Sequence, residues 1–264
     1  MKKLLTLVLT LALIAVSAFA FAESTKLVIG ATSTPHGEIL EFAKPLLAEK
    51  GIELDIQIFE DYVMPNEQLE AKDLDANFFQ HIPYLENFNA EKGTHLAVLG
   101  GVHLEPMGIY LNTVASLDEV ADGAVVFIPN DTTNEYRALK VLATYGLISL
   151  PETDSLELTA LDITADLNPK GLKFQEIAAE SIPNLFDDCD LAVINSNYAL
   201  QAGEDRVGKP AVLEATEDNP YVNVVAVRED DDREALKTLI EVLQGDEVAA
   251  FITETYGDAV IPAK

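Results

Sequence analysis

Residues 75–84 hold the densest cluster of aromatic and polar side chains in the sequence, reading DANFFQHIPY. If this stretch begins as a strand, Asn77 and Phe79 point to one side before the chain turns into a helix. Phe79, His81 and Tyr84 can therefore line one wall of a site where the strand meets the helix. The same spacing also fits a packed core with a polar rim, which is the commoner use of neighbouring aromatic residues.

Arg137 is the second candidate, and it lies in the first two turns of a helix that we expect to begin near Thr132. A cation there opposes the helix dipole. Free backbone N–H groups and a bidentate guanidinium at the same point would, however, suit a bound anion. Asn134 lies three residues earlier and shares this face of the helix. The alternative is a surface ion pair with one of the 45 acidic residues, and the spacing leaves both interpretations open.

Two asparagines stand at points where the chain could reach a ligand. Asn195 directly follows the apolar run 191–194, and Asn223 lies in a segment that we expect to cross between two parts of the molecule. Either could be a helix cap or a turn residue, which is the commoner role of a lone asparagine. Together with Arg137 and the aromatic wall, they could instead form one site shaped for an amino acid.

Short apolar runs alternate with amphipathic segments along the chain, and these elements must position the candidates. We expect strands at residues 26–31, 54–58, 74–79, 124–128, 172–177, 191–194 and 222–228. Helices between them indicate an α/β protein with largely parallel sheets. Two such series indicate two lobes, and because open α/β sheets bind ligands at the carboxyl ends of their strands, we expect a site in the cleft between the lobes.

Residues 1–22 have the pattern of a secretory signal peptide. Lys2 and Lys3 precede an apolar run, and small residues follow, with cleavage expected after Ala22. A retained N-terminal anchor is the alternative, because residues 4–22 have about the length of a membrane span. No later stretch is long and apolar enough, so the mature chain is not expected to span a membrane.

The composition excludes several functions. The 264 residues, 48% of them apolar, suffice for one large or two small domains, and the net charge of −28 would repel nucleic acids and anionic membranes. Cys189 is the single cysteine, and the four histidines are far apart in sequence. We therefore expect no disulfide, no bound metal and no cofactor. No catalytic or nucleotide-binding motif occurs, and we expect no enzymatic activity.

Residues 59–69 and 73–85, FEDYVMPNEQL and DLDANFFQHIPYL, closely resemble the methionine-binding lipoprotein family of the NlpA type. These are substrate-binding proteins of ABC importers. The segments 129–137, 191–199 and 220–230 resemble the same family in the same order, so the resemblance covers essentially the whole mature chain. It implies a two-lobed periplasmic-binding-protein fold, type 2 like. Residues 23–110 and 225–264 would form one lobe, and residues 111–224 the other.

The resemblance also implies the role of each site residue. Arg137 resembles the carboxylate clamp, with Asn134 beside it, and its side chain should be mostly hydrated in an empty cleft. Asn195 and Asn223 resemble the partners of the amino and carboxylate groups. The wall around the methionine side chain would consist of Tyr62, Phe79, His81 and Tyr84. The implied partners are methionine or a close analogue and the permease and ATPase subunits of an ABC importer. We expect the protein to be a monomer.

One departure from the family concerns the leader. The family usually carries a lipobox cysteine at the end of its signal, and residues 17–24 contain none. We therefore expect a secreted, periplasmic protein without a lipid anchor. Three alternative functions stay open: binding of another apolar amino acid, binding of a short methionine-containing peptide, or action as an extracytoplasmic chaperone or interaction protein on the same fold.

Overall fold

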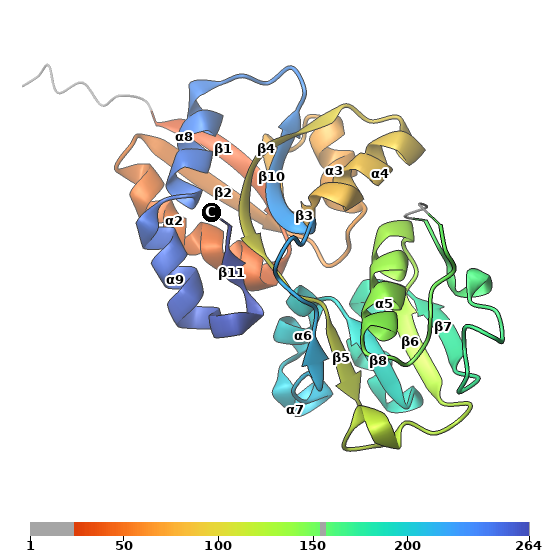
Figure 1. Ribbon diagram of the computed structural model, residues 1–264. Helices are drawn as coiled ribbons and strands as arrows, with labels where there is room; N and C mark the ends of the chain where they lie inside the picture. Colours follow the sequence, from red (N-terminus) through yellow and green to blue (C-terminus); the bar gives the residue numbers. More distant parts are fainter. Residues whose placement is uncertain (1–23, 154–156, 264) are drawn as a thin grey trace, which may run out of the picture.

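A computed structural model describes residues 24–153 and 157–263 of the chain. The predicted signal peptide and its cleavage site lie outside these residues. The described chain forms two lobes, each built on one β-sheet (Figure 1). Within the described ranges, no helix has both the length and the apolar character needed to cross a membrane.

The first lobe contains a six-stranded sheet in the order β11-β4-β10-β3-β1-β2. Its strands are β1 (Thr25–Ala31), β2 (Ile52–Ile58), β3 (Ala76–His81), β4 (Leu96–Leu104), β10 (Val222–Arg228) and β11 (Ile261–Pro262). Its helices are α2 (Glu38–Ala48), α3 (Met64–Glu70), α4 (Ile82–Lys92), α8 (Glu234–Leu243) and α9 (Asp246–Tyr256). Figure 1 shows α2, α8 and α9 on one side of this sheet and α3 and α4 on the other.

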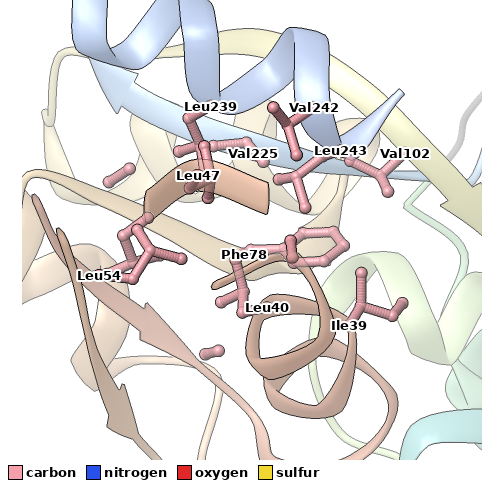
Figure 2. Close-up of a cluster of buried hydrophobic side chains, with 14 of the residues drawn as sticks. Ile39, Leu40, Leu47, Leu54, Phe78, Val102, Val225, Leu239, Val242 and Leu243 are labelled. Carbon is pink, nitrogen blue, oxygen red and sulfur yellow. The ribbon is translucent and has the colours of Figure 1, made fainter. Parts of the chain in front are cut away.

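The core of the first lobe follows from the helical spacing of apolar residues in α2. Ile39, Leu40, Ala43 and Leu47 are all fully buried against the sheet and helix α8 (Figure 2). Phe78 lies in the same cluster, so its side chain leaves the other face of β3 free for Asn77 and Phe79.

The second lobe contains a five-stranded sheet in the order β7-β6-β8-β5-β9. Its strands are β5 (Gly108–Leu111), β6 (Val125–Pro129), β7 (Lys173–Ile177), β8 (Leu191–Ile194) and β9 (Val212–Leu213). Its helices are α5 (Thr132–Thr144), α6 (Ser196–Ala202) and α7 (Glu204–Val207). Successive residues of β6 and β8 enter two different clusters, so α5 covers one face of the sheet and α6 the other. Short helical turns complete the molecule at η1 (Ser33–Gly37), η2 (Leu117–Glu119), η3 (Ala160–Asp162), η4 (Ala179–Ser181), η5 (Pro183–Asp188) and η6 (Gly257–Ala259).

Both sheets are mixed, which differs from the expected largely parallel arrangement. Strand β1 is parallel to β2 and β3, and β6 is parallel to β7 and β8. The strands β10 and β5 are antiparallel to their neighbours. The physical reason is the connection between the lobes, because β5 and β10 each follow a crossover and enter their sheet from the side of the hinge.

The chain crosses between the lobes through residues 105–107 and again through residues 214–221. Residues 108–110 pair in the second sheet and residues 222–224 in the first. The predicted lobe boundaries therefore differ from strand membership by a few residues. Each crossover continues directly into a strand of the other sheet. The pattern of apolar residues therefore does not show where the chain leaves one lobe and enters the other.

Candidate functional site

The structure brings all eight predicted site residues together around one cavity between the lobes. Four further residues line the cavity and were not predicted from the sequence: Gln80, Glu105, Ser196 and Asn197. The complete lining is Tyr62, Phe79, Gln80, His81, Tyr84, Glu105, Asn134, Arg137, Asn195, Ser196, Asn197 and Asn223. That these side chains contact a ligand stays a prediction.

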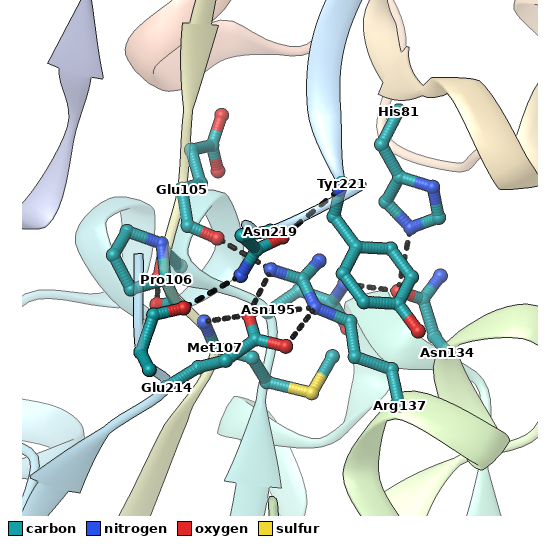
Figure 3. Close-up of polar contacts among 12 residues, drawn as sticks. His81, Glu105, Pro106, Met107, Asn134, Arg137, Asn195, Glu214, Asn219 and Tyr221 are labelled. Carbon is teal, nitrogen blue, oxygen red and sulfur yellow. Dashed lines mark hydrogen bonds and ion pairs between the residues drawn. The ribbon is translucent and has the colours of Figure 1, made fainter. Parts of the chain in front are cut away.

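His81 connects the aromatic wall to the second lobe. It ends β3 and caps α4, where its Nδ1 accepts a hydrogen bond from the backbone N–H of Tyr84 at 3.1 Å. Nε2 must then carry the proton, and it donates across the cleft to Oδ1 of Asn134 at 3.1 Å (Figure 3). Burial and the charge of Arg137 lower the pKa of His81 to about 3, so the imidazole is neutral at neutral pH.

Three aromatic rings form the apolar part of the cavity. The ring centroid of Tyr62 lies 5.8 Å from that of Phe79 and 5.7 Å from that of Tyr84. The Tyr62 hydroxyl donates to Oδ1 of Asn197 at 2.6 Å, which links the lobes. The wall is therefore assembled from two segments of the first lobe and held against α6 of the second.

Gln80 belongs to an amide network behind this wall. Its Nε2 donates to Oδ1 of Asn66 at 2.7 Å and to Oδ1 of Asn77 at 2.9 Å, and Asn77 donates to Asn66 at 2.8 Å. All three side chains are buried. The polar side chains of residues 75–84 thus have two different roles. Asn77 and Gln80 connect β3 to α3 by hydrogen bonds, while His81 faces the second lobe.

Arg137 is buried and paired, which differs from both interpretations of its position in the sequence. It is 2% exposed, and its Nε and Nη2 donate to Glu214 at 3.0 and 2.6 Å. Nη2 also donates to the carbonyl of Glu105 at 2.7 Å, and the guanidinium carbon lies 4.2 Å from the centre of the Tyr221 ring (Figure 3). The expectation of a mostly hydrated side chain is therefore wrong, because the crossover segments enclose it. The hydrogen bonds that the guanidinium donates to described residues come from Nε and Nη2.

Two polar atoms at the cavity have no hydrogen-bond partner among the described residues and are fully buried: Oδ1 of Asn195 and Nδ2 of Asn197. Asn195 stands at the N-cap of α6 without capping it, and its Nδ2 donates to Oδ1 of Asn134 at 2.8 Å. An unpaired buried polar group costs about 1–3 kcal/mol. The cavity therefore presents one acceptor and one donor that a ligand would satisfy.

Glu105 lies in the first crossover and faces the cavity from a buried network. Its Oε1 accepts from Nε2 of His103 at 2.7 Å and lies 3.2 Å from Nε2 of His36. His36 also bonds Oδ1 of Asn223 at 3.0 Å. Burial raises the pKa of Glu105, while His36 and Arg137 act in the opposite direction. Burial lowers the pKa of His36 to about 4 and that of His103 to about 3, so both imidazoles are neutral at neutral pH.

His36, His103 and Glu105 have ligand atoms within 4.8 Å of one another, close enough to hold a metal ion. A histidine that binds a metal normally donates its other ring N–H to an acceptor. Nδ1 of His103 has no partner among the described residues. The donor set therefore fits a hydrogen-bonded network around Glu105 better than a metal centre.

Two lobes, joined by two crossovers and closed over a polar and aromatic cavity, define a two-lobed ligand-binding protein of the periplasmic-binding-protein class. The sequence profile described as NlpA lipoprotein matches residues 27–264, and the chain therefore belongs to the NlpA lipoprotein family. The predicted family and fold class are confirmed.

Several relatives carry names of binding proteins. The methionine-binding lipoprotein MetQ of Bacillus subtilis (strain 168) is 41% identical over 248 residues, which cover 91% of this chain and 90% of the relative. The structure of a nutrient binding protein from Burkholderia cenocepacia bound to methionine is similar with a TM-score of 0.85 and 35% identity, covering 90% of this chain and 100% of that chain. The structure of an ABC transporter periplasmic substrate-binding protein from Coxiella burnetii is similar with a TM-score of 0.82 and 36% identity, over 90% of this chain and 100% of that chain.

The prediction for localisation is wrong. We expected a secreted periplasmic protein without a lipid anchor, whereas the relatives are named lipoproteins. The prediction depended on one missing cysteine between residues 17 and 24. The absence of one acylation residue excludes a single chemical route and not membrane attachment as such, so it was too narrow a basis.

Proposed function

We propose that this protein is an extracytoplasmic solute-binding protein that binds methionine and delivers it to an ABC importer. The observation that carries the proposal is the pair of buried atoms without a partner among the described residues, Oδ1 of Asn195 and Nδ2 of Asn197, in a cavity that is also lined by Arg137 and an aromatic wall. An α-amino acid with an apolar side chain supplies the complementary donor, acceptor and apolar surface.

The charges of the cavity suggest how the ligand is oriented. The carboxylate binds Nη1 of Arg137 and Nδ2 of Asn197, because the guanidinium bonds described residues through its other two nitrogens and Nδ2 has no partner among them. The ammonium binds Oδ1 of Asn195 and faces the Glu105 carboxylate. The side chain then lies among the rings of Tyr62, Phe79 and Tyr84, where a thioether sulfur gains favourable contact with aromatic edges.

The hydrogen bonds that close the cavity favour a single amino acid over a peptide. These bonds run between the lobes and include Tyr62 to Asn197 at 2.6 Å and Tyr198 to the Glu60 carbonyl at 2.9 Å. A second residue attached to either end of the ligand would require these bonds to break. A peptide should therefore bind more weakly than the free amino acid.

We propose that the ligand is bound without chemical change. Among the described residues of the cavity lining, Ser196 is the only serine or threonine, and its hydroxyl donates a hydrogen bond to the Pro106 carbonyl rather than to a base. His81 is occupied at both ring nitrogens. The described lining thus contains no activated nucleophile and base pair.

Mass spectrometry of material released by denaturing the purified protein, followed by calorimetry of ligand-free protein against all amino acids, tests the function. We expect saturable one-to-one binding of methionine and weaker binding of leucine and of methionyl dipeptides. Asn195→Ala should weaken methionine binding, whereas Asn184→Ala, at an exposed position outside the lining, should not. Tighter binding of a dipeptide, or no binding of any amino acid, would refute the proposal.

A further inference from the structure

Glu214 is the partner that fixes the orientation of Arg137. It lies in the second crossover, 77 residues from Arg137 in sequence. Its two carboxylate oxygens accept from Nε at 3.2 and 3.0 Å and from Nη2 at 2.6 Å, so one whole edge of the guanidinium is occupied (Figure 3). The side chains of the pair are 3% and 12% exposed, which protects their interaction from screening by solvent.

Two further contacts restrain the same guanidinium from other directions. Nη2 donates to the backbone carbonyl of Glu105 in the first crossover at 2.7 Å. The ring of Tyr221 in the second crossover lies over the guanidinium plane, 4.2 Å from its carbon. Arg137 is thus tied to both crossovers and also lines the cavity. Its hydrogen bonds to described residues come from Nε and Nη2, which leaves Nη1 for a ligand.

We propose that Glu214 is a positioning residue that acts through Arg137 and reserves Nη1 for the carboxylate of the ligand. The ligand carboxylate then accepts a hydrogen bond from one fixed nitrogen of the guanidinium, and it does not bind the bidentate edge that Glu214 occupies. Because both crossovers meet at this guanidinium, carboxylate binding is coupled to the segments about which the lobes move. The inference rests on the proposed function, since it concerns an amino acid carboxylate.

The charge of Glu214, taken alone, predicts the opposite change in ligand affinity when this residue is replaced. The Glu214 carboxylate repels an approaching ligand carboxylate, so its removal would strengthen binding if charge were its main contribution. Without Glu214, however, the guanidinium can turn toward the neighbouring hollow lined by Thr144, Glu217 and Asp218, which offers other acidic partners and water. Orientation and charge therefore predict opposite changes in affinity, and a measurement separates them.

The test compares Glu214→Ala and Glu214→Gln with the control Glu217→Gln, which changes an exposed carboxylate of the same crossover. Circular dichroism checks folding, and calorimetry measures methionine binding. Loss of a hydrogen bond to a charged group predicts an affinity about 10- to 150-fold lower for Glu214→Ala. Glu214→Gln, which keeps one acceptor, should lose less and carries the test if the alanine variant does not fold. Glu217→Gln should bind like the wild type.

A double-mutant cycle with Arg137→Ala shows whether Glu214 acts through Arg137. We expect the double variant to bind methionine no more weakly than Arg137→Ala alone. As a second readout, 3-(methylthio)propylamine, which lacks the carboxylate, should bind the wild type and Glu214→Gln within threefold of each other. Unchanged or stronger methionine binding by both Glu214 variants, or equal losses with and without Arg137, would overturn the inference. If the wild type does not bind methionine, the proposed function fails instead.

Discussion

Replacing Arg137 by alanine should damage both binding and stability. The side chain is 2% exposed and is ion-paired to Glu214 at 2.6 Å. Removing one partner of a buried pair costs about 3–5 kcal/mol, because the other charge is left uncompensated. The Glu214 side chain is 12% exposed and keeps some access to water, so we expect the lower end, about 3 kcal/mol. For a chain of this size that lowers Tm by about 6–12 °C.

The effect on binding is a separate one, because the proposed ligand loses its own ionic partner. Removing one side of a desolvated charge pair costs about 2–5 kcal/mol, which weakens methionine binding about 30-fold to several thousand-fold. Arg137→Lys should recover only part of this loss, because an ammonium cannot hold Glu214, the Glu105 carbonyl and the ligand in one plane.

Calorimetry and thermal denaturation of wild type, Arg137→Ala and the Arg137→Ala/Glu214→Ala double variant measure both effects. The double variant should regain part of the lost stability, since it has no orphaned carboxylate, while its binding stays weak. A Tm of Arg137→Ala within 2 °C of wild type would refute the buried pair. Methionine binding within threefold of wild type would place the carboxylate clamp elsewhere.

Three further predictions concern closure, the core and pH. Tyr62→Phe removes a 2.6 Å hydrogen bond between the lobes and should weaken methionine binding about fivefold in calorimetry; unchanged affinity would contradict a role in closure. Leu40→Ala, at a fully buried position, should cost about 2–5 kcal/mol in urea denaturation, whereas Leu161→Ala, at a position that is 90% exposed, should cost almost nothing. Burial lowers the pKa of His36 to about 4 and that of His103 to about 3, whereas a histidine in an unfolded chain has a pKa near 6.5. The unfolded chain therefore binds protons before the folded one does, and the free energy of unfolding falls as the pH drops from about 6.5 toward 4. The fall should be steeper for wild type than for His103→Gln, and equal slopes would refute this contribution.

The alternation of side chains along a strand was enough to predict that Phe78 and Phe79 point to opposite faces, whereas the family resemblance was needed to add Tyr62 to the wall. The alternation places Phe78 in the core and Phe79 toward the cavity, and the structure has this arrangement. The start of α4 directly after His81 could also be predicted, because Pro83 lies in the first turn of the helix, where proline is favoured. Local patterns therefore predict which way each side chain points within one element.

Glu105 and Asn197 could not be found in this way. Glu105 is one of 45 acidic residues and lies in a crossover without periodicity, so no local pattern separates it from the surface carboxylates. Asn197 lies within α6, and its position at the cavity depends on how the lobes meet, where it accepts a hydrogen bond from Tyr62. The pairing of Arg137 with Glu214 spans 77 residues and depends on the path of the second crossover. Long-range contacts of this kind are set by the packing of the two sheets.

The two lobes contribute unlike chemistry to the cavity, and this makes recognition depend on closure. The wall from the first lobe is aromatic and uncharged, since the pKa of His81 is lowered to about 3. The second lobe and the crossovers supply Arg137, Glu105 and the two unsatisfied asparagine atoms. An apolar molecule without a zwitterionic head would satisfy only the first lobe, and glycine would satisfy only the second. A ligand favours the closed state only by the contacts that it makes with both lobes. Under the proposed function, selectivity for methionine is expressed in the equilibrium between open and closed lobes. Arg137, which we propose to bind the ligand carboxylate and which contacts both crossovers, is the residue at which recognition and closure meet.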